Sequence, residues 1–404
     1  MPIEKISGVY LSEEVDYELS GTGSKIPVFI GLTGNTTTGS YKVDGTQVRK
    51  YTNYTRLNKA VTAGGIGVVD ASETSPTNLL NGTLRKFYEE ARLTNPNDIG
   101  VPYIYVIDVG DGTAKQSWLN AVDYAISKTD ADLLVFVGTE NITYTPEGSE
   151  EPVSYSVVDL MKSVNTVLTS KTTNFQIFNA FFTRTNATTD GNYTAMTSAQ
   201  YGCQASRIGV VEWDNYNFGK TIARICLTPY YTEVGYLPYR SVKPGTFKQR
   251  TLEQKLTLQS AGIIFNHDEV VNDTIYPRMN RCIATSYAST NRPADARFHA
   301  RFIADEVLRP IYEVAYPFIK SNDTETNIVK LQVKVDDVVD SFIRREECRA
   351  WNSGTETGTR LTVIESTEDP YDLEIVGYIQ PVNTIDNILV RERINTATLY
   401  NGDG

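Results

Sequence analysis

The strongest constraint in this sequence is the alternation, through its first half, of short apolar segments with helix-like patterns. Residues 28–32, 101–109 and 132–137 each have the length and apolar content of a buried strand. Between the first two, apolar residues recur at helical spacing, at Leu80, Leu84, Phe87, Tyr88 and Ala91. Consecutive apolar strands joined by helices indicate a largely parallel sheet covered on both faces. The sequence therefore predicts an α/β fold.

The same alternation continues as far as residue 212. Two further helices are predicted by the apolar stripes Trp118, Leu119, Val122, Ala125 and Ile126, and Val157, Leu160, Met161, Val164 and Leu168. Two further strands are predicted at residues 175–182 and 208–212. From Gly219 onward the order gives way to a stretch rich in Pro and Tyr. We interpret that stretch as a crossing between two bodies of the molecule.

A second unit with a different order of elements is expected beyond this crossing. A helix is predicted from about Ala294, and Pro310 should kink or end it. Val333 and Val335 suggest a strand, and Asp336 is a candidate N-cap for a helix that stops before Gly354. Two strand patterns follow in the tail, at residues 373–379 and 388–394. This mixture predicts an α+β unit after the α/β unit.

The N-terminal segment has the pattern of a single extended strand. Its odd positions Val9, Leu11, Val15, Tyr17 and Leu19 are apolar, broken only by Glu13, whereas its even positions Ser12, Glu14, Asp16 and Glu18 are polar. An extended arm of about 20 residues spans roughly 65 Å at about 3.3 Å per residue. A globule of this chain length has a radius of gyration of about 21 Å. The arm is therefore long enough to reach a neighbouring molecule.

The C-terminal strand pattern complements the N-terminal one in charge. Ile388, Val390 and Ile394 share one face, and Leu389, Arg391 and Arg393 share the other. A strand with an acidic face and a strand with a basic face are suited to cross-strand pairing. Each exposed pair contributes only about 0.2–1 kcal/mol, so such pairs set register and do not by themselves hold an assembly together.

Composition excludes several classes of protein. The net charge of −11 argues against a surface built to coat the phosphate backbone of nucleic acid. No uninterrupted apolar run of about 18 residues is present, so the sequence predicts no membrane span. The first residues lack a basic region followed by an apolar block, which favours intracellular synthesis. The four cysteines, Cys203, Cys226, Cys282 and Cys348, form no C-x-x-C pair, which argues against structural zinc.

Two segments resemble parts of ligand sites. Gly219, Lys220 and Thr221 form a GKT triplet, but Asp214 stands where a phosphate-binding loop needs glycine. A turn at the entry to a strand is the alternative reading. The loop around Asp111 follows a predicted strand at its carboxyl end, where α/β enzymes hold ligands, although a plain loop also fits it.

The usual catalytic and metal-binding residue types form no recognisable constellation. His267 precedes Asp268 and Glu269, a group for which a solvated loop is the favoured reading over a metal site. His299 lies on an apolar helix face, where hydrogen bonding to Asp295 or to a carbonyl is expected. No G-x-S-x-G elbow occurs. We therefore identify no catalytic, cofactor-binding or metal-ligating residues from these patterns.

Several segments together resemble one family, in the order in which that family has them. The residues that carry the likeness are SGVYLSE at 7–13, PVFIGLT at 27–33, the stretch 223–242, LTLQSAGII at 256–264, the block 282–311, the helix pattern 336–354 and the closing strands 373–394. They are similar to segments of the sheath proteins of contractile phage tails and related contractile injection systems. The sequence departs from that pattern at Ser7, where the family has proline, and at residues 281–285.

The resemblance implies a two-domain tail-sheath-like fold with extended N- and C-terminal arms. Residues 1–26 would form the N-terminal arm of the inner domain, 27–250 an outer α/β domain, and 251–404 an inner polymerisation domain that includes the C-terminal strand. Sheath subunits surround a tail tube, and their arms add strands to sheets of neighbouring subunits. The family has no catalytic residues and no cofactor, so the resemblance implies a protein that is not an enzyme.

The function implied is that of a structural subunit which polymerises around a tail tube and contracts to drive the tube through the target cell envelope. Its implied partners are further copies of itself in helical or hexameric rings, the tail tube protein, and the baseplate and tail terminator proteins, without nucleic acid binding or membrane insertion. Its implied location is the virion tail, after synthesis in the host cytoplasm. Arg344 and Arg345 are candidate contacts to the tube.

Two alternatives remain open from the sequence. The βαβ pattern and the Asp111 loop would also fit an α/β enzyme that binds a small or nucleotide ligand. A polymerising virion protein that does not contract would share the extended arms. The sequence does not distinguish a virus from a cell-encoded injection system.

Overall fold

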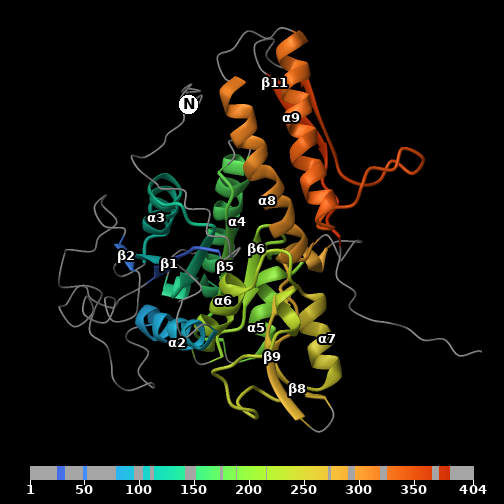
Figure 1. Ribbon diagram of the computed structural model, residues 1–404. Coiled ribbons are helices and arrows are strands. Elements are labelled where there is room, and N and C mark those ends of the chain that lie inside the picture. Colours follow the sequence, from blue (N-terminus) through green and yellow to red (C-terminus); the bar gives the residue numbers. More distant parts are fainter. Residues whose placement is uncertain are drawn as a thin grey trace, which may run out of the picture.

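The computed structural model describes residues 25–31, 49–51, 79–94, 103–109, 113–141, 152–172, 176–187, 189–214, 216–271, 274–289, 296–318, 325–365 and 373–382. Figure 1 shows a broad lower body that contains the large sheet, and a second body above it that contains two long helices. Within these ranges, no helix combines the length and the hydropathy that crossing a bilayer requires.

A seven-stranded sheet forms the centre of the lower body. Its order is β2 (Arg49–Tyr51), β3 (Ile104–Asp108), β1 (Pro27–Gly31), β4 (Leu133–Val137), β5 (Asn179–Phe182), β6 (Ile208–Val211) and β7 (Ile263–Ile264). All neighbouring strands are parallel except β2 and β3, which are antiparallel. The prediction of a largely parallel sheet is confirmed, and each strand predicted up to residue 212 overlaps one of these strands.

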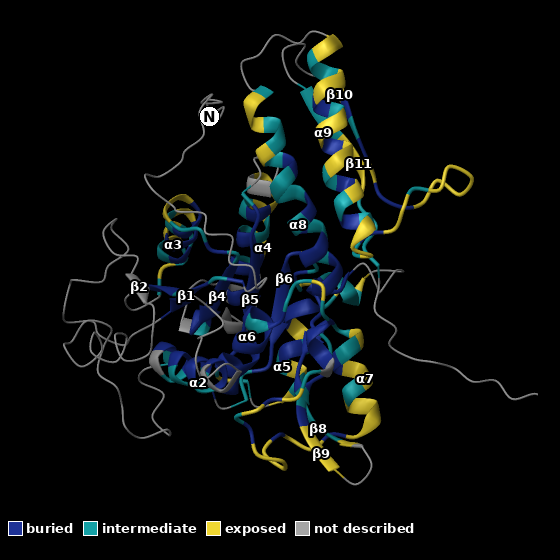
Figure 2. Ribbon diagram, viewed as in Figure 1, coloured by how far each residue is buried: buried dark blue, intermediate teal, exposed yellow. Residues whose placement is uncertain are grey.

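Helices cover both faces of the sheet, as the continuous apolar strands require. On one face, Phe29 packs with α2 (Leu79–Thr94) and α6 (Asn217–Leu227) in a cluster that we call the α2–α6 core. On the other, Val28 and Ile30 pack with α3 (Lys115–Lys128) and α4 (Pro152–Thr172) in the α3–α4 core. Figure 2 shows the strands buried between these helices. Alternate side chains of β1 therefore pack into opposite cores.

The GKT triplet lies inside helix α6, so both readings from the sequence are wrong. A Cβ at Gly219 would lie 2.1 Å from the carbonyl oxygen of Thr83 on α2, so the glycine allows close packing of the two helices. The buried Lys220 Nζ donates to the carbonyl oxygen of Ser241 at 3.1 Å and pairs with Glu89. The triplet packs one helix onto another and holds its lysine inside the fold.

The sheet and its cores extend beyond residue 250. Helix α7 (Leu252–Ser260) precedes β7, and a hairpin of β8 (Asn266–Val271) and β9 (Thr274–Met279) follows it. The shorter helices of the lower body are α5 (Asp190–Thr194), η2 (Thr139–Asn141), η3 (Ala195–Thr197), η4 (Val234–Tyr236) and η5 (Thr285–Ala288). Residues up to Phe302 contribute to the α2–α6 core, and the next core begins at Ile303.

The second body consists of α8 (Phe298–Ala315), η7 (Tyr316–Phe318), α9 (Glu325–Arg344), and the antiparallel pair β10 (Arg360–Glu365) and β11 (Leu373–Tyr378). Its interior, the α8–α9 core, combines apolar residues of both helices and both strands. Helix α8 joins the two bodies, because Phe298 and Phe302 lie in the α2–α6 core whereas Ile303, Val307 and Ile311 lie in the α8–α9 core.

Two predictions about α9 are wrong. Val333, Val335 and Asp336 all lie within α9, so there is neither a strand at the valines nor a helix start at Asp336. The stripe Leu331, Val335, Val339 and Phe342 is buried at helical spacing, which favours one long helix. Pro310 lies within α8, which continues to Ala315, because the flanking Val307 and Ile311 are fully buried and hold the helix in place.

A buried ion pair fixes α8 against the sheet. Arg207, which precedes β6, makes a bidentate contact with Asp305 of α8, with nitrogen to oxygen distances of 3.1 and 2.9 Å. The side chains are 6% and 4% exposed. The Nδ2 atom of Asn179 donates to the same carboxylate at 2.9 Å. All three polar groups are therefore satisfied away from water.

Candidate assembly surfaces

The β10–β11 pair is a small sheet with only one face covered. Toward the α8–α9 core, Leu361 and Val363 of β10 are buried, whereas Leu373 and Ile375 of β11 are only partly buried. On the outer face, Ile364, Val376 and Tyr378 are 36%, 40% and 69% exposed. Two strands alone are marginally stable in water, and this pair depends on α9 for its support. The core is complete on the β10 side and incomplete on the β11 side.

The two edges of this small sheet differ. Leu361 and Val363 of β10 bond through their outward backbone groups to the side chain of Gln332 on α9. Directly opposed residues of an antiparallel pair share the same orientation, so Gly377 and Ile375 of β11 also point their backbone groups outward. No described residue hydrogen-bonds to these groups of β11. The outer edge of β11 is therefore an open strand edge within the described chain.

The backbone holds the start of the C-terminal segment beside this sheet. The amide of Arg349 donates to the carbonyl oxygen of Gln380, and the amide of Val382 donates to that of Glu347, both at 2.9 Å. Trp351 stacks on Tyr378 with ring centroids 6.5 Å apart and planes 9° from parallel. The chain beyond Val382 therefore starts from a fixed point close to β11.

The root of the N-terminal segment is fixed by a buried lysine. Lys25 Nζ donates to the carbonyl oxygens of Ile225 and Thr228 at 3.2 and 2.7 Å, and lies 4.4 Å from the ring centroid of Phe302. Its backbone amide donates to the carbonyl oxygen of Cys226. Burial lowers the pKa of the Lys25 ammonium to about 8. Any force on the segment before Lys25 would act on the end of α6.

Asp132 adds a second attachment at this root. Its Oδ2 accepts the backbone amide of Ile26 at 2.8 Å, and its Oδ1 accepts a hydrogen bond from Arg309 of α8. Arg309 also approaches Glu306 on the same helix. The root of the N-terminal segment is thus connected both to β4 and to the helix that joins the two bodies.

The predicted tube contacts lie at the C-terminal end of α9. Arg344 and Arg345 are both exposed. Arg345 pairs with Glu347 at 3.3 Å, and its guanidinium lies 4.3 Å from the ring centroid of Phe342. The outer surface of α9 also exposes Val329 and Val333, and Figure 2 shows exposed patches recurring along the helix. Both arginines therefore lie at the surface, where Arg345 already has Glu347 as a partner within the chain.

The predicted arm residues lie outside the described chain. They are Val9, Leu11, Glu14, Val15, Asp16, Tyr17, Glu18 and Leu19 at one end and Ile388, Val390, Arg391, Arg393 and Ile394 at the other. The Asp111 loop also lies outside it. Their predicted roles stay predictions.

Sequence reasoning missed β10, Gln332 and Lys25. The alternation of Leu361 and Val363 with polar neighbours was nevertheless a signal for β10.

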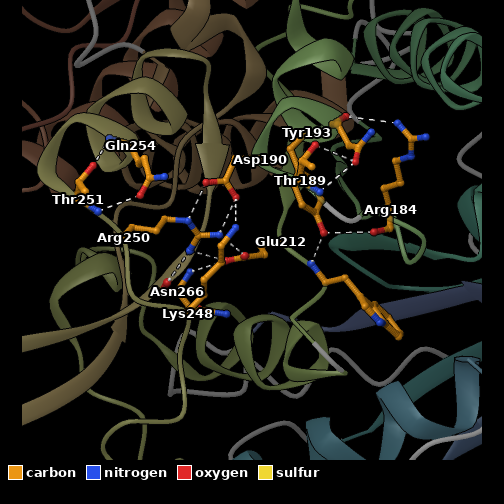
Figure 3. Close-up of polar contacts among 12 residues, drawn as sticks. Arg184, Thr189, Asp190, Tyr193, Glu212, Lys248, Arg250, Thr251, Gln254 and Asn266 are labelled. Atoms are coloured by element: carbon orange, nitrogen blue, oxygen red, sulfur yellow. Dashed lines mark hydrogen bonds and ion pairs between the residues drawn. The ribbon is translucent and has the colours of Figure 1, made fainter.

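A group of charged side chains surrounds the buried Arg250, shown in Figure 3. Arg250 bonds to Asp190, to Glu212 and to the carbonyl oxygen of Asn266, and Lys248 also pairs with Asp190. Burial alone would raise the pKa of Asp190, but hydrogen bonds from the two cations lower it below its ordinary value. The group joins α5, β6 and β8 to the segment before α7, which is a structural role.

Two titratable groups nearby have shifted pKa values. Burial, with a smaller contribution from Glu212, raises the pKa of Asp214 to about 6. Burial also lowers the pKa of His267 to about 4.

The two histidines differ in how they compare with their predictions. His267 lies in β8, so its prediction as a solvated loop is wrong, whereas His299 bonds to the carbonyl oxygen of Tyr231 as expected. Among the described residues, no three His, Cys, Asp or Glu side chains are grouped to hold a metal ion.

The comparison with known proteins gives matches among solved structures. No family model matches this chain, and no curated protein matches it. The contracted helical sheath of the anti-feeding prophage is 11% identical, with a TM-score of 0.59, over 96% of this chain and 99% of that chain. The contracted PVC sheath complex of an extracellular contractile injection system is 10% identical, with a TM-score of 0.60. This match covers 96% of the present chain and 97% of the PVC chain.

A sheath tail protein from Desulfitobacterium hafniense is also similar. It is 9% identical, with a TM-score of 0.55, and the match covers 96% of this chain and 100% of that chain. At identities this low a likeness establishes the fold. The chain has the fold of contractile sheath proteins, which confirms the fold expected from the sequence resemblance.

Proposed function

We propose that this chain is a structural subunit of a contractile sheath, which polymerises around a tail tube and contracts to drive the tube through a target cell envelope. One observation carries the proposal: the match to sheath structures covers nearly the whole of this chain and of theirs, including the second body with its open strand edge. A match limited to the body with the parallel sheet would be compatible with many functions.

Subunits of the proposed sheath are linked by exchanged strands. The arms at residues 9–19 and 388–394 would each extend a sheet of a neighbouring copy, a contact called β-augmentation. The open edge of β11 and the fixed points at Lys25 and Val382 support this arrangement. A contact of this kind that does not close on itself generates a helical array, which is the geometry of a sleeve.

The proposed domains are the N-terminal arm at 1–26, an outer domain at 27–250 and an inner polymerisation domain at 251–404. Because β7 belongs to the parallel sheet, the inner domain would share its first part with the outer one, and the cores separate within α8. Contraction would re-dock the globular domains of neighbouring copies between two packings while the exchanged strands keep these copies connected.

The proposed partners follow from this arrangement. They are other copies of the chain, a tail tube protein, and baseplate and terminator proteins at the two ends of the sheath. The sheath would belong to the tail of a virion or of an injection particle and would be synthesised in the host cytoplasm. We expect no catalytic activity from it, in keeping with the structural role of the similar proteins.

Microscopy of the purified chain tests the proposal. We expect hollow tubes or stacked rings by negative stain after concentration, because the open strand edge and the arms favour end-to-end addition of copies. The full-length chain below its assembly concentration serves as the monomer control. A chain that stays monomeric under all concentrations and salts, with both arms packed on their own molecule, would contradict the proposal.

Charge reversal tests the proposed tube contact. Replacing both Arg344 and Arg345 by glutamate should weaken co-sedimentation with the tube protein by about tenfold or more, since two exposed cations become anions at one surface. The matched control reverses Lys330 and Lys334, two exposed cations earlier on α9, and should have a smaller effect. Unchanged co-sedimentation of the arginine variant, with normal sheath assembly, would remove these residues from the contact.

A further inference from the structure

Gln332 makes three hydrogen bonds that fix its side-chain amide against β10. Its Nε2 donates to the carbonyl oxygen of Leu361 at 3.0 Å, and its Oε1 accepts the amide of Val363 at 2.8 Å. The Nε2 atom also donates to Asp336 Oδ1, one turn later on α9, at 2.8 Å. The amide group therefore has a single orientation, in which both of its ends bond to the strand.

These bonds occupy the groups that a neighbouring strand would need. A carbonyl oxygen and the amide two residues later, both on the outward side of a strand, are the pair that one residue of a parallel neighbour bonds to. The side chain of Gln332 takes the place of that residue, at the centre of β10. A strand could pair with this edge only after displacing the glutamine from both bonds. The edge of β10 is therefore closed by a side chain.

The packing on the opposite side of the sheet points to the other edge. Leu361 and Val363 of β10 are 6% and 7% exposed, whereas Leu373 and Ile375 of β11 remain partly exposed beside the same core. An added strand next to β11 would cover these two side chains with its own apolar face. The edge that is open is therefore also the edge at which the core is incomplete.

Charge favours one arm as the occupant. Glu374 projects from β11 on the face away from the core. The C-terminal strand pattern would turn its apolar face, with Ile388 and Val390, toward the core, and its basic face, with Arg391 and Arg393, toward Glu374. The acidic N-terminal arm would instead bring like charges together.

We propose that Gln332 closes the edge of β10 and thereby directs the C-terminal strand of a second copy to the edge of β11. This inference rests on the proposed sheath function, because it specifies where the exchanged strand binds. Gln332 acts through the strand edge and is thus a positioning residue. Without it, both edges would accept a strand, and the register and direction of assembly would no longer be unique.

Hydrogen exchange at single amides of the full-length chain tests the proposal. In the monomer, Gln332→Ala should raise the exchange rate of the Val363 amide by about tenfold, the value of one lost hydrogen bond, whereas Lys334→Ala should leave it unchanged. On assembly of the wild type, the amides of Ile375 and Gly377 should become protected while that of Glu365 on the β10 edge should not. In assembled Gln332→Ala, Glu365 should become protected as well.

Proline variants identify the edge independently. Ile375→Pro removes an outward amide of β11 and should abolish assembly, whereas Ile375→Ala, which loses the side chain but keeps the amide, should retain it in part. Glu365→Pro at the β10 edge should leave assembly intact. Circular dichroism of each monomer identifies any variant that fails to fold, and the exchange data above do not depend on these variants.

Three results would overturn the proposal: an unchanged Val363 amide in Gln332→Ala, protection of Glu365 upon wild-type assembly, or β11 amides already protected in the monomer by the chain's own tail. Failure of the wild type to assemble would instead count against the sheath function. In that case the exchange rate of Val363 in the monomer still tests whether Gln332 closes the β10 edge.

Discussion

Replacing Asp305 by alanine should lower the free energy of unfolding by about 3–5 kcal/mol, the largest loss of stability that we expect from a single substitution. The change leaves the guanidinium of Arg207 buried without its bidentate partner and removes the acceptor of Asn179. Urea unfolding of the monomer, followed by circular dichroism, measures the loss. The transition should shift to lower urea with little change in its slope.

Two comparisons separate this effect from a general effect of losing a carboxylate. Asp340→Ala removes an exposed carboxylate from α9 and should change stability by no more than about 0.5 kcal/mol. Replacing Arg207 and Asp305 together by methionine and leucine should recover much of the loss, because no unpaired charge then remains buried. A loss below about 1 kcal/mol for Asp305→Ala would mean that water reaches the arginine, contrary to its 6% exposure.

Deleting residues 1–20 should abolish polymerisation and leave a folded monomer. The deletion removes the proposed donated strand but retains Lys25 and Ile26, whose hydrogen bonds attach the chain to α6 and β4. Loss of even two buried apolar side chains, at about 1.5 kcal/mol or more each, raises the dissociation constant by roughly a hundredfold or more. Sedimentation velocity and negative-stain microscopy measure assembly, and thermal unfolding checks the monomer.

Point variants make the same test without shortening the chain. Leu11→Asp combined with Val15→Asp places charges on the apolar face of the arm and should act like the deletion. Ser12→Asp adds a charge to the polar face and should leave assembly nearly unchanged. If the truncated chain forms normal tubes, the N-terminal arm does not link the subunits.

The parallel sheet could be predicted because its strands are apolar on both faces. Phe29 packs into one core, whereas Val28 and Ile30 pack into the opposite one. Each strand is therefore a continuous apolar run, which can be recognised in the sequence without knowing which strands lie beside it. The helices between them show a clear stripe, as for Trp118 and Val122 on α3. Local pattern and final structure agree for these strands and helices, whereas the short β2 and α5 were not predicted.

Helix α9 was mispredicted because two periodicities overlap in its sequence. Leu331, Val333 and Val335 alternate with polar residues like a strand, while Leu331, Val335 and Val339 also recur at helical spacing. The structure resolves the conflict by burying the second set and leaving Val333 54% exposed. Only the packing against β10 and α8, remote in sequence, decides between the two patterns.

The candidate assembly surfaces depended still more on distant partners. Gln332 and the strand that it contacts are 29 residues apart, and nothing in the local sequence indicates that an amide side chain closes a strand edge. Lys25 lies 200 residues from Ile225, whose carbonyl oxygen it contacts. Arg344 and Arg345, by contrast, were chosen from sequence as a basic pair in the predicted inner domain, and the structure exposes both side chains.

The continuity of α8 through two cores has a mechanical consequence. Its first turns are fixed to the parallel sheet by Phe298, Phe302 and Asp305, and its later turns are fixed to α9 by Val307 and Ile311, with no loop between. A force applied to the β10–β11 pair would therefore be transmitted through α8 to the parallel sheet as a torque. Such a subunit would turn as one piece, and the work of shortening a filament would be done at the joints between molecules.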